Sequence, residues 1–237
     1  MSTIMKPEMA PPSRSDALAT AESNGNRENS SLAQHAYTHI KQLILSGKLK
    51  CGEKISDKIL SKALNISRTP VREALKLLEQ YGLVEFKPRS YAKVASISED
   101  AAKCLAMVRT EIEKLAARLL IADNEKLNPD TLTRHVKRSL HHMDNGNIAE
   151  AFLNDSAFHL EMARQSNNPT LYEVLERLDS KSHLIRLRSM LIPEAYNQQL
   201  HEHLEIIDCL KKRNQKKVLR LLELHISIRF WESQKLN

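Results

Sequence analysis

The stretch SRTPVREALKLLEQYGLVEFKPRSYAKV, residues 67–94, constrains the fold more than any other part of this 237-residue chain. Its first half reads as a short amphipathic helix that Ser67 can cap. Arg68 and Arg72 are four residues apart, so both project from one side of that helix. Gly82 ends the helix, and the residues after it favour a basic two-stranded hairpin. An arginine-bearing helix beside a basic hairpin can enter a major groove, which predicts a DNA-binding module.

The excess of positive charge is confined to the same region. Residues 31–97 carry twelve basic and five acidic side chains, an excess of seven that equals the net charge of the whole chain, +7. Such a block attracts polyanions through counterion release, and the remainder of the chain has no such bias. A basic surface kept for solubility is the alternative. The coincidence of the charge with the helix and hairpin favours nucleic acid.

Composition and periodicity predict a mainly α protein with two domains. Helices expected at 32–46 and 56–64 precede the arginine-bearing helix, and with the hairpin they form a winged helix-turn-helix domain over residues 31–97. Residues 1–30 are rich in Ser, Asn, Pro and Ala without apolar periodicity, which predicts a disordered tail.

Residues 98–237 are expected to form an all-helical antiparallel bundle of about six helices. Leu, Ile, Met and Ala recur at three- and four-residue spacing, and Asn, Gly and Pro punctuate the segments. The expected helices cover 98–122, 129–144, 147–166, 170–191, 193–212 and 215–234.

Three further features indicate a cytoplasmic location without membrane association. The chain has no run of eighteen apolar residues, and its N-terminus lacks an apolar signal core. The three cysteines are odd in number and far apart, which is typical of free thiols in a reducing compartment.

One group of residues in the second half has the chemistry of a metal site. Asp155 and His159 are one helical turn apart, so their side chains point the same way. His203 and His225 lie on two later helices, each among apolar residues. Three imidazoles and a carboxylate suit a divalent cation such as zinc, nickel or manganese. The alternative is that each histidine is a hydrogen-bonded core residue, and the residues alone leave both interpretations open.

Both halves resemble the GntR family of bacterial transcription regulators, in the branch whose C-terminal domain is the all-helical FCD type. The resemblance covers about residues 32–236 and, in the second half, fits the metal-binding members of the branch. It is carried by ILSGKLKCGEKIS, LSKALNISRTPVREALKLLEQYGLV, VRTEIEKLAARLL, the D-x-x-F-H motif at Asp155–His159, Asn168-Pro169, and Glu202-His203 followed by His225.

The resemblance implies which residues contact DNA. An arginine at the N-terminal end of the helix that begins near Ser67 suits guanine, because its planar guanidinium group pairs with guanine O6 and N7 together. Lys58 replaces an arginine that is often found at its position, and Tyr91 replaces a glycine near the tip of the wing. The wing tip is therefore expected to engage phosphate. The residues assigned to DNA are Lys58, Ser67, Arg68, Thr69, Arg72 and Arg89.

The resemblance also implies a ligand set in the bundle, namely Asp155, His159, His203 and His225 around a divalent metal. Zinc is favoured, with nickel or manganese as alternatives. A small organic acid is expected to complete the coordination.

Arg109 matches an arginine that commonly meets the carboxylate of this effector. An ion pair with Glu113, four residues further on, is the alternative role. Arg186 and Arg188 are further candidates to line the pocket, but they are expected on different helix faces and are not assigned to the site.

The function implied by the resemblance is that of a ligand-responsive repressor that binds a pseudo-palindromic operator as a homodimer. Effector binding would shift the relative placement of the two DNA-binding domains. The chain is not expected to be an enzyme. A metal-dependent hydrolase with a DNA-binding appendage is the main alternative, but no additional acid or base stands near the motif. A third interpretation is an architectural DNA binder whose bundle only dimerises.

Overall fold

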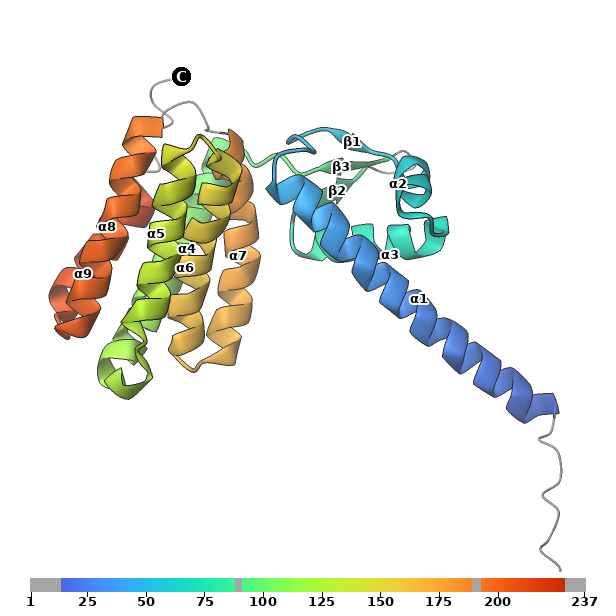
Figure 1. Cartoon of the computed structure of the whole chain (residues 1–237), viewed down its shortest axis with the longest axis horizontal. Coiled ribbons are helices and arrows are strands. Elements are labelled where there is room, and N and C mark those ends of the chain that lie inside the picture. Colours follow the sequence, from blue (N-terminus) through green and yellow to red (C-terminus); the bar gives the residue numbers. More distant parts are fainter. Residues whose placement is uncertain (1–13, 88–90, 189–192, 229–237) are drawn as a thin grey trace, which may run out of the picture.

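The computed structural model describes residues 14–87, 91–188 and 193–228, and it confirms a mainly α protein in which a winged helix-turn-helix unit precedes a helical bundle (Figure 1). The first unit runs helix, strand, helix, helix and hairpin. Its elements are α1 (Arg14–Leu45), β1 (Lys54–Ile55), α2 (Asp57–Leu64), α3 (Arg68–Gln80), β2 (Val84–Phe86) and β3 (Ala92–Val94).

Local sequence explains the tight turn between α2 and α3. Ser56 caps α2, since its side chain accepts a hydrogen bond from the Ile59 N–H. Asn65 ends α2 in the left-handed region with φ 53°, a conformation that asparagine tolerates. Ser67 occupies the N-cap position of α3 as predicted, although its side chain makes no capping hydrogen bond with the described backbone of that helix. The chain is thereby turned so that α3 presents its N-terminal end to solvent.

The hairpin predicted after α3 is part of a three-stranded antiparallel sheet in the order β1-β3-β2. The sequence did not predict β1, which is only two residues long and pairs Lys54 with Lys93. Buried residues of α1, α3 and the sheet form one core. They include Ala36, Ile40, Ile44, Val71, Leu75, Leu78, Leu83 and Val94.

The first helix differs from the prediction. It begins at Arg14, so residues 14–30 are helical where a disordered tail was expected, and residues 1–13 lie outside the described part of the chain. Ala, Glu and Arg in this segment favour helix, and no proline interrupts it after Pro12. The segment also contains Gly25 and several Ser and Asn residues, which favour helix only weakly, so local propensity alone does not account for the extension.

The second unit contains the six helices that were predicted (Figure 1). The ends of the predicted helices 170–191 and 215–234 fall partly outside the described residues. Ser98 and Asn128 cap the first two, by accepting hydrogen bonds from the N–H groups of Ala101 and Thr131. The bundle consists of α4 (Glu99–Ala122), α5 (Pro129–Asp144), α6 (Ile148–Gln165), α7 (Pro169–Arg188), α8 (Pro193–Lys211) and α9 (Gln215–Glu223), with a 3-10 turn η1 (Asn124–Lys126) and a π-helical segment η2 (Leu224–Ile228).

Helix α7 joins the two units. Leu184 is buried in the core of the winged helix-turn-helix unit although it belongs to the bundle. His183, the residue before it, donates a 2.7 Å hydrogen bond from Nε2 to the carbonyl of Leu45, the last residue of α1. The bundle and the winged helix-turn-helix unit are therefore packed against each other.

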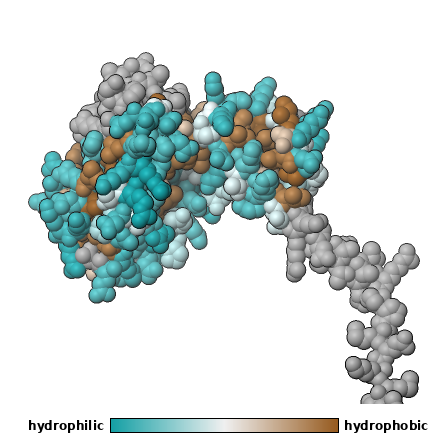
Figure 2. All heavy atoms as spheres, in the orientation of Figure 1, coloured by the Kyte–Doolittle hydropathy of each residue, from teal (hydrophilic) through white to brown (hydrophobic). Residues whose placement is uncertain are grey.

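Polar side chains cover much of the visible face of the bundle, with apolar residues between them (Figure 2). Among the described residues, no helix has both the length and the apolar character needed to cross a membrane.

His183 makes the stability of this junction sensitive to acid. Burial, followed by the charge of Arg186, lowers the pKa of His183 to about 4. An unfolded imidazole titrates near 6.5, so the folded state binds fewer protons and loses stability as the pH falls from about 6.5 to 4. We expect the acid-induced decrease in the free energy of unfolding to be smaller by about 2–3 kcal/mol in His183→Phe than in wild type. Urea unfolding of chelator-treated protein at pH 7 and pH 4.5 measures it. His141→Phe, at an exposed position on α5, is the control, and parallel pH profiles for wild type and His183→Phe would contradict the assignment.

Candidate metal centre and nucleic-acid interface

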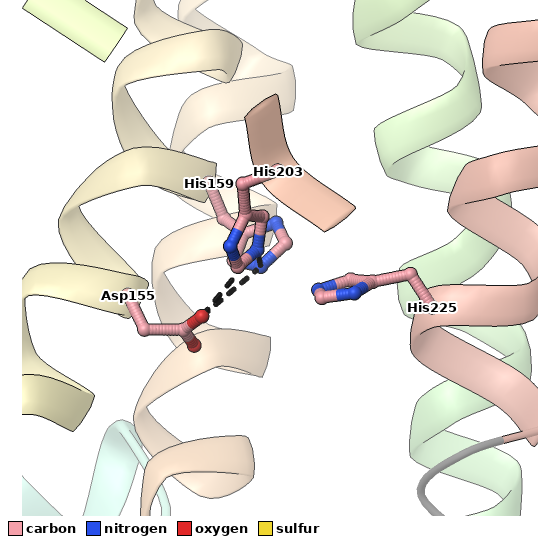
Figure 3. A group of neighbouring side chains, drawn as sticks. All are labelled: Asp155, His159, His203 and His225. Atoms are coloured by element: carbon pink, nitrogen blue, oxygen red, sulfur yellow. Dashed lines mark hydrogen bonds and ion pairs between the residues drawn. The ribbon is translucent and has the colours of Figure 1, made fainter. Parts of the chain in front are cut away.

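The four side chains predicted to bind metal converge inside the bundle (Figure 3). Asp155 and His159 come from α6, His203 comes from α8, and His225 approaches from η2 on another side. One ligand atom from each residue lies within 4.8 Å of those of the other three. None of the four side chains is more than 7% exposed. The fold thus brings three distant segments to one buried point.

The spacing among Asp155, His159 and His203 fits the ligands of a single cation. His159 Nε2 and His203 Nε2 are 3.2 Å apart, and Asp155 Oδ1 lies 3.4 Å from His203 Nε2 and 3.9 Å from His159 Nε2. Two ligands at zinc–ligand distances and the tetrahedral angle would be separated by about 3.3–3.5 Å. The donor set, three imidazoles and one carboxylate, also suits zinc, nickel or manganese.

Carboxylates outside the cluster orient two of the imidazoles. His159 Nδ1 lies 2.6 Å from Glu113 Oε2, and His225 Nδ1 lies 3.1 Å from Glu202 Oε2. A carboxylate on Nδ1 holds the proton there and leaves the Nε2 lone pair to bind a cation. Such partners are typical of metal-binding histidines, and they give this cluster a second layer of support.

Arg186 contacts the cluster directly. Its Nη1 donates to Asp155 Oδ2 at 2.7 Å, and its Nη2 contacts Ser156 and lies 3.2 Å from Asp179 Oδ1. Asp155 therefore directs one oxygen to the imidazoles and the other to a guanidinium group. Sequence reasoning ranked Arg186 low as a pocket residue, whereas it lies against the cluster because α7 packs on α6 with this face inward.

Arg109 adopts the alternative role considered for it, and it also borders the cluster. Its Nε donates to Glu113 Oε1 at 2.6 Å, so the predicted ion pair is present and is fully buried. Its Nη2 is 3.6 Å from Asp179 Oδ1 and has no hydrogen-bond partner among the described residues. A buried donor of this kind is available to an acceptor that enters the site.

The charges of the site keep the carboxylates ionised. Burial opposes ionisation of Glu113, yet its pKa is lowered to about 2 because His159 and Arg109 face it. Burial likewise opposes ionisation of Asp155, and the pKa of this carboxyl is nevertheless lowered, chiefly by the charge of Arg186. Burial lowers the pKa values of His159 and His203, which favours the neutral form that binds metal.

Sequence reasoning did not assign Glu113, Asp179, Arg186 or Glu202 to this site. Asp179 and Arg186 are seven residues apart, which places both on one face of α7, and that spacing was the available signal. The side chain of Arg188 lies outside the described residues.

Five of the six residues predicted to contact DNA belong to the described part of the chain, and they lie on the surface of the first unit. Arg72 is exposed near the start of α3, and Arg68 is exposed but held by Asp57, whose two oxygens lie 2.9 Å and 2.8 Å from Arg68 Nη2. Arg89 falls outside the described residues. The other predicted residues, all exposed, are Lys58, Ser67 and Thr69.

A groove of about 910 Å³ separates the start of α3 from the wing. Arg68 and Arg72 line one side, and Lys54 and Lys87 line the other. Lys54 Nζ lies 4.5 Å above the ring of Tyr91, so the tyrosine holds a cation in this groove. The sequence did not single out Lys54 or Lys87. Their basic side chains extend the positive surface beyond helix α3.

Comparisons with known proteins agree with both halves of this arrangement. The model for bacterial regulatory proteins of the gntR family matches residues 32–94, and the FCD domain model matches residues 104–227. The FCD match alone spans more than half of the chain. The protein therefore belongs to the GntR family of transcription regulators, with an FCD domain as its C-terminal unit.

Individual relatives point the same way. The chain is 29% identical over 181 residues to the uncharacterized HTH-type transcriptional regulator YdhC of Bacillus subtilis strain 168, covering 75% of this chain and 80% of the relative. It is 24% identical over 193 residues to the HTH-type transcriptional repressor RspR of Escherichia coli K12, covering 81% and 85%. The structure of E. coli McbR/YncC shares the fold with a TM-score of 0.75 at 22% identity, covering 87% of this chain and 99% of that one.

Metal uptake tests the cluster directly. We expect one zinc ion per chain in wild type, and loss of that ion in His203→Ala with the helical content retained. We expect Glu113→Gln to weaken zinc binding by about 10–100-fold, because it removes the carboxylate that orients His159. Metal analysis and chelator competition on the purified proteins measure both effects. His142→Ala on α5 is the control, and unchanged zinc content in His203→Ala would disprove the ligand assignment.

Proposed function

We propose that the protein is a ligand-responsive cytoplasmic repressor that binds a pseudo-palindromic operator as a homodimer. A small organic acid would act as effector at a divalent metal held by Asp155, His159, His203 and His225. The observation that carries this proposal is the buried cluster of one carboxylate and three imidazoles, with ligand atoms within 4.8 Å, in a chain whose other unit is a GntR-type DNA-binding domain.

DNA recognition would rest on the N-terminal end of α3. Exposed Arg72 is free to approach a base edge, and Arg68 is held in place by Asp57 on the neighbouring helix. A guanidinium group fixed before binding loses less rotamer freedom when it meets DNA. Lys54 and Lys87, across the groove, would contact phosphates.

The proposed homodimer is supported by an exposed apolar surface on α4. Met107 is 68% exposed, Val108 51% and Leu115 39%. Val108 and Leu115 are seven residues apart and share a helix face. A second copy packed along this face would bury these side chains and place two recognition helices for two half-sites.

The proposed effector would reach the metal and Arg109 together. A bound divalent cation supplies a Lewis-acid site that a carboxylate oxygen can occupy. The Nη2 group of Arg109, which has no hydrogen-bond partner within the described residues, would donate to the same carboxylate. Zinc is the favoured metal, and nickel or manganese would suit the same donors.

The hydrolase alternative is not favoured by the surroundings of the cluster. A hydrolase needs a carboxylate or imidazole placed to activate water. Glu113 is engaged by His159 and Arg109, and Glu202 by His225. These carboxylates orient ligands, and the site is better suited to binding than to turnover.

A DNA-binding measurement tests the role of α3. With an operator selected from a random pool, we expect Arg72→Ala to weaken operator binding by about 5–150-fold, because a bidentate base contact is lost. Binding to random DNA should weaken far less. Fluorescence anisotropy on both DNAs gives the two affinities, with Arg118→Ala on the bundle as the control. Equal losses on operator and random DNA would show that Arg72 contacts only phosphate.

A ligand screen tests the effector site. We expect zinc-loaded wild type to gain thermal stability with one class among sugar acids, dicarboxylates and amino acids, and to leave the compound chemically unchanged. Arg109→Met should lose this stabilisation while keeping its zinc. Differential scanning fluorimetry and NMR of the recovered compound provide the readouts. Conversion of the compound would favour the hydrolase alternative.

A further inference from the structure

Helix α7 has one face in the metal-site network and an adjacent face in the DNA-binding unit. Asp179 and Arg186, two helical turns apart, face the cluster. Glu176, His183 and Leu184 face the first unit. All five side chains belong to one continuous helix, so a displacement at one face is carried to the other.

On the face of α7 that meets the metal cluster, the interactions of Arg186 depend on what Asp155 binds. Arg186 Nη1 is 2.7 Å from Asp155 Oδ2, while Asp155 Oδ1 faces His203 at 3.4 Å. A cation held by Oδ1 would withdraw negative charge from the oxygen that Arg186 contacts, and the attraction of Arg186 to Asp179, 3.2 Å away, would then weigh more. Occupancy of the cluster therefore changes the balance of forces on Arg186.

The adjacent face of α7 contacts the C-terminal end of α1. The Leu45 carbonyl is one of the groups that a helix C-terminus leaves without an intrahelical partner, and His183 Nε2 satisfies it at 2.7 Å. Leu184 is buried beside it, and its carbonyl lies 3.7 Å from Cys51 Sγ. The Lys181 side chain fills the space into which any side chain at position 82 would project, at the turn after α3.

The C-terminal part of α1, which ends at Leu45, packs against helix α3. Ile40 and Ile44 of α1 share one core cluster with Val71 and Leu75 of α3. Val71 is the residue before Arg72. Closely packed cores pass on a displacement as a shift between discrete arrangements. A movement of the C-terminal end of α1 would therefore reach the arginine that meets DNA.

We propose that α7 couples the two sites, with Arg186 responding to occupancy of the Asp155 cluster and His183 passing the response to the C-terminal end of α1. This inference rests on the proposed metal site. It explains how a fully buried site in the bundle can alter the DNA-binding unit without touching DNA. His183 acts as a positioning residue in this scheme.

Hydrogen–deuterium exchange of the full chain with and without zinc tests the coupling. In wild type, zinc should slow exchange both in peptides of α6 and α8 and in the peptide covering 41–52, by about fivefold or more for the most affected amides. His183→Phe keeps an aromatic ring but loses the donor to Leu45. It should retain zinc and the change in α6 and α8, and lose the change in 41–52.

His183→Gln is the matched control, since its side-chain amide can still donate to Leu45 and should preserve the response in 41–52. If wild-type protein binds zinc but the exchange rates in peptide 41–52 do not change, the coupling is disproved while the metal site stands. A full response in folded His183→Phe would disprove the coupling in the same way. A wild-type protein that takes up no zinc would overturn the proposed metal site and this inference with it. If His183→Phe does not fold, the wild-type exchange pattern still decides.

Discussion

The carboxylate of Asp155 is the group on which the arrangement of the bundle depends. One oxygen faces the imidazoles of His159 and His203, and the other accepts a hydrogen bond from Arg186. A buried ionised carboxylate is tolerated only when it is paired, and removing one partner of such a pair typically costs about 3–5 kcal/mol. Helices α6, α7 and α8 are thereby held to one point by charge as well as by apolar packing.

The same constraint relates the bundle to the DNA-binding unit. Because Arg186 and Leu184 are two residues apart on α7, the helix cannot move at the cluster without moving inside the core of the first unit. A regulator needs such a connection, since coupling between two sites is a free energy shared by both. The buried polar network is costly to maintain, and the proposed role in regulation would account for its presence at the centre of an otherwise apolar bundle.

Much of this arrangement could be predicted from the sequence, because periodicity and caps act locally. The six bundle helices and the turn at Asn65 follow from residues close in the chain. The spacing of Asp155 and His159 predicted a shared helix face, His203 and His225 were candidate partners on later helices, and the family resemblance joined the four as a ligand set. Their convergence within 4.8 Å depends on how three helices pack, which no local pattern determines.

What the sequence missed has a physical explanation in each case. Arg186 was ranked low because of its helix face relative to Arg188, whereas it pairs with Asp155 on the neighbouring helix α6 and with Asp179, seven residues earlier on α7. The two-residue strand β1 exists only because β3 pairs with it. The ion pair between Asp57 and Arg68 joins two helices whose relative placement is tertiary.

Anomalous X-ray scattering from crystals of the full chain grown with zinc tests the central claim most directly. The account predicts one strong peak at the zinc edge, about 2.0–2.2 Å from the Nε2 atoms of His159, His203 and His225 and from Asp155 Oδ1. A strong anomalous peak elsewhere with none at this cluster would contradict it. So would the absence of any peak at the four side chains when the crystals are grown at saturating zinc.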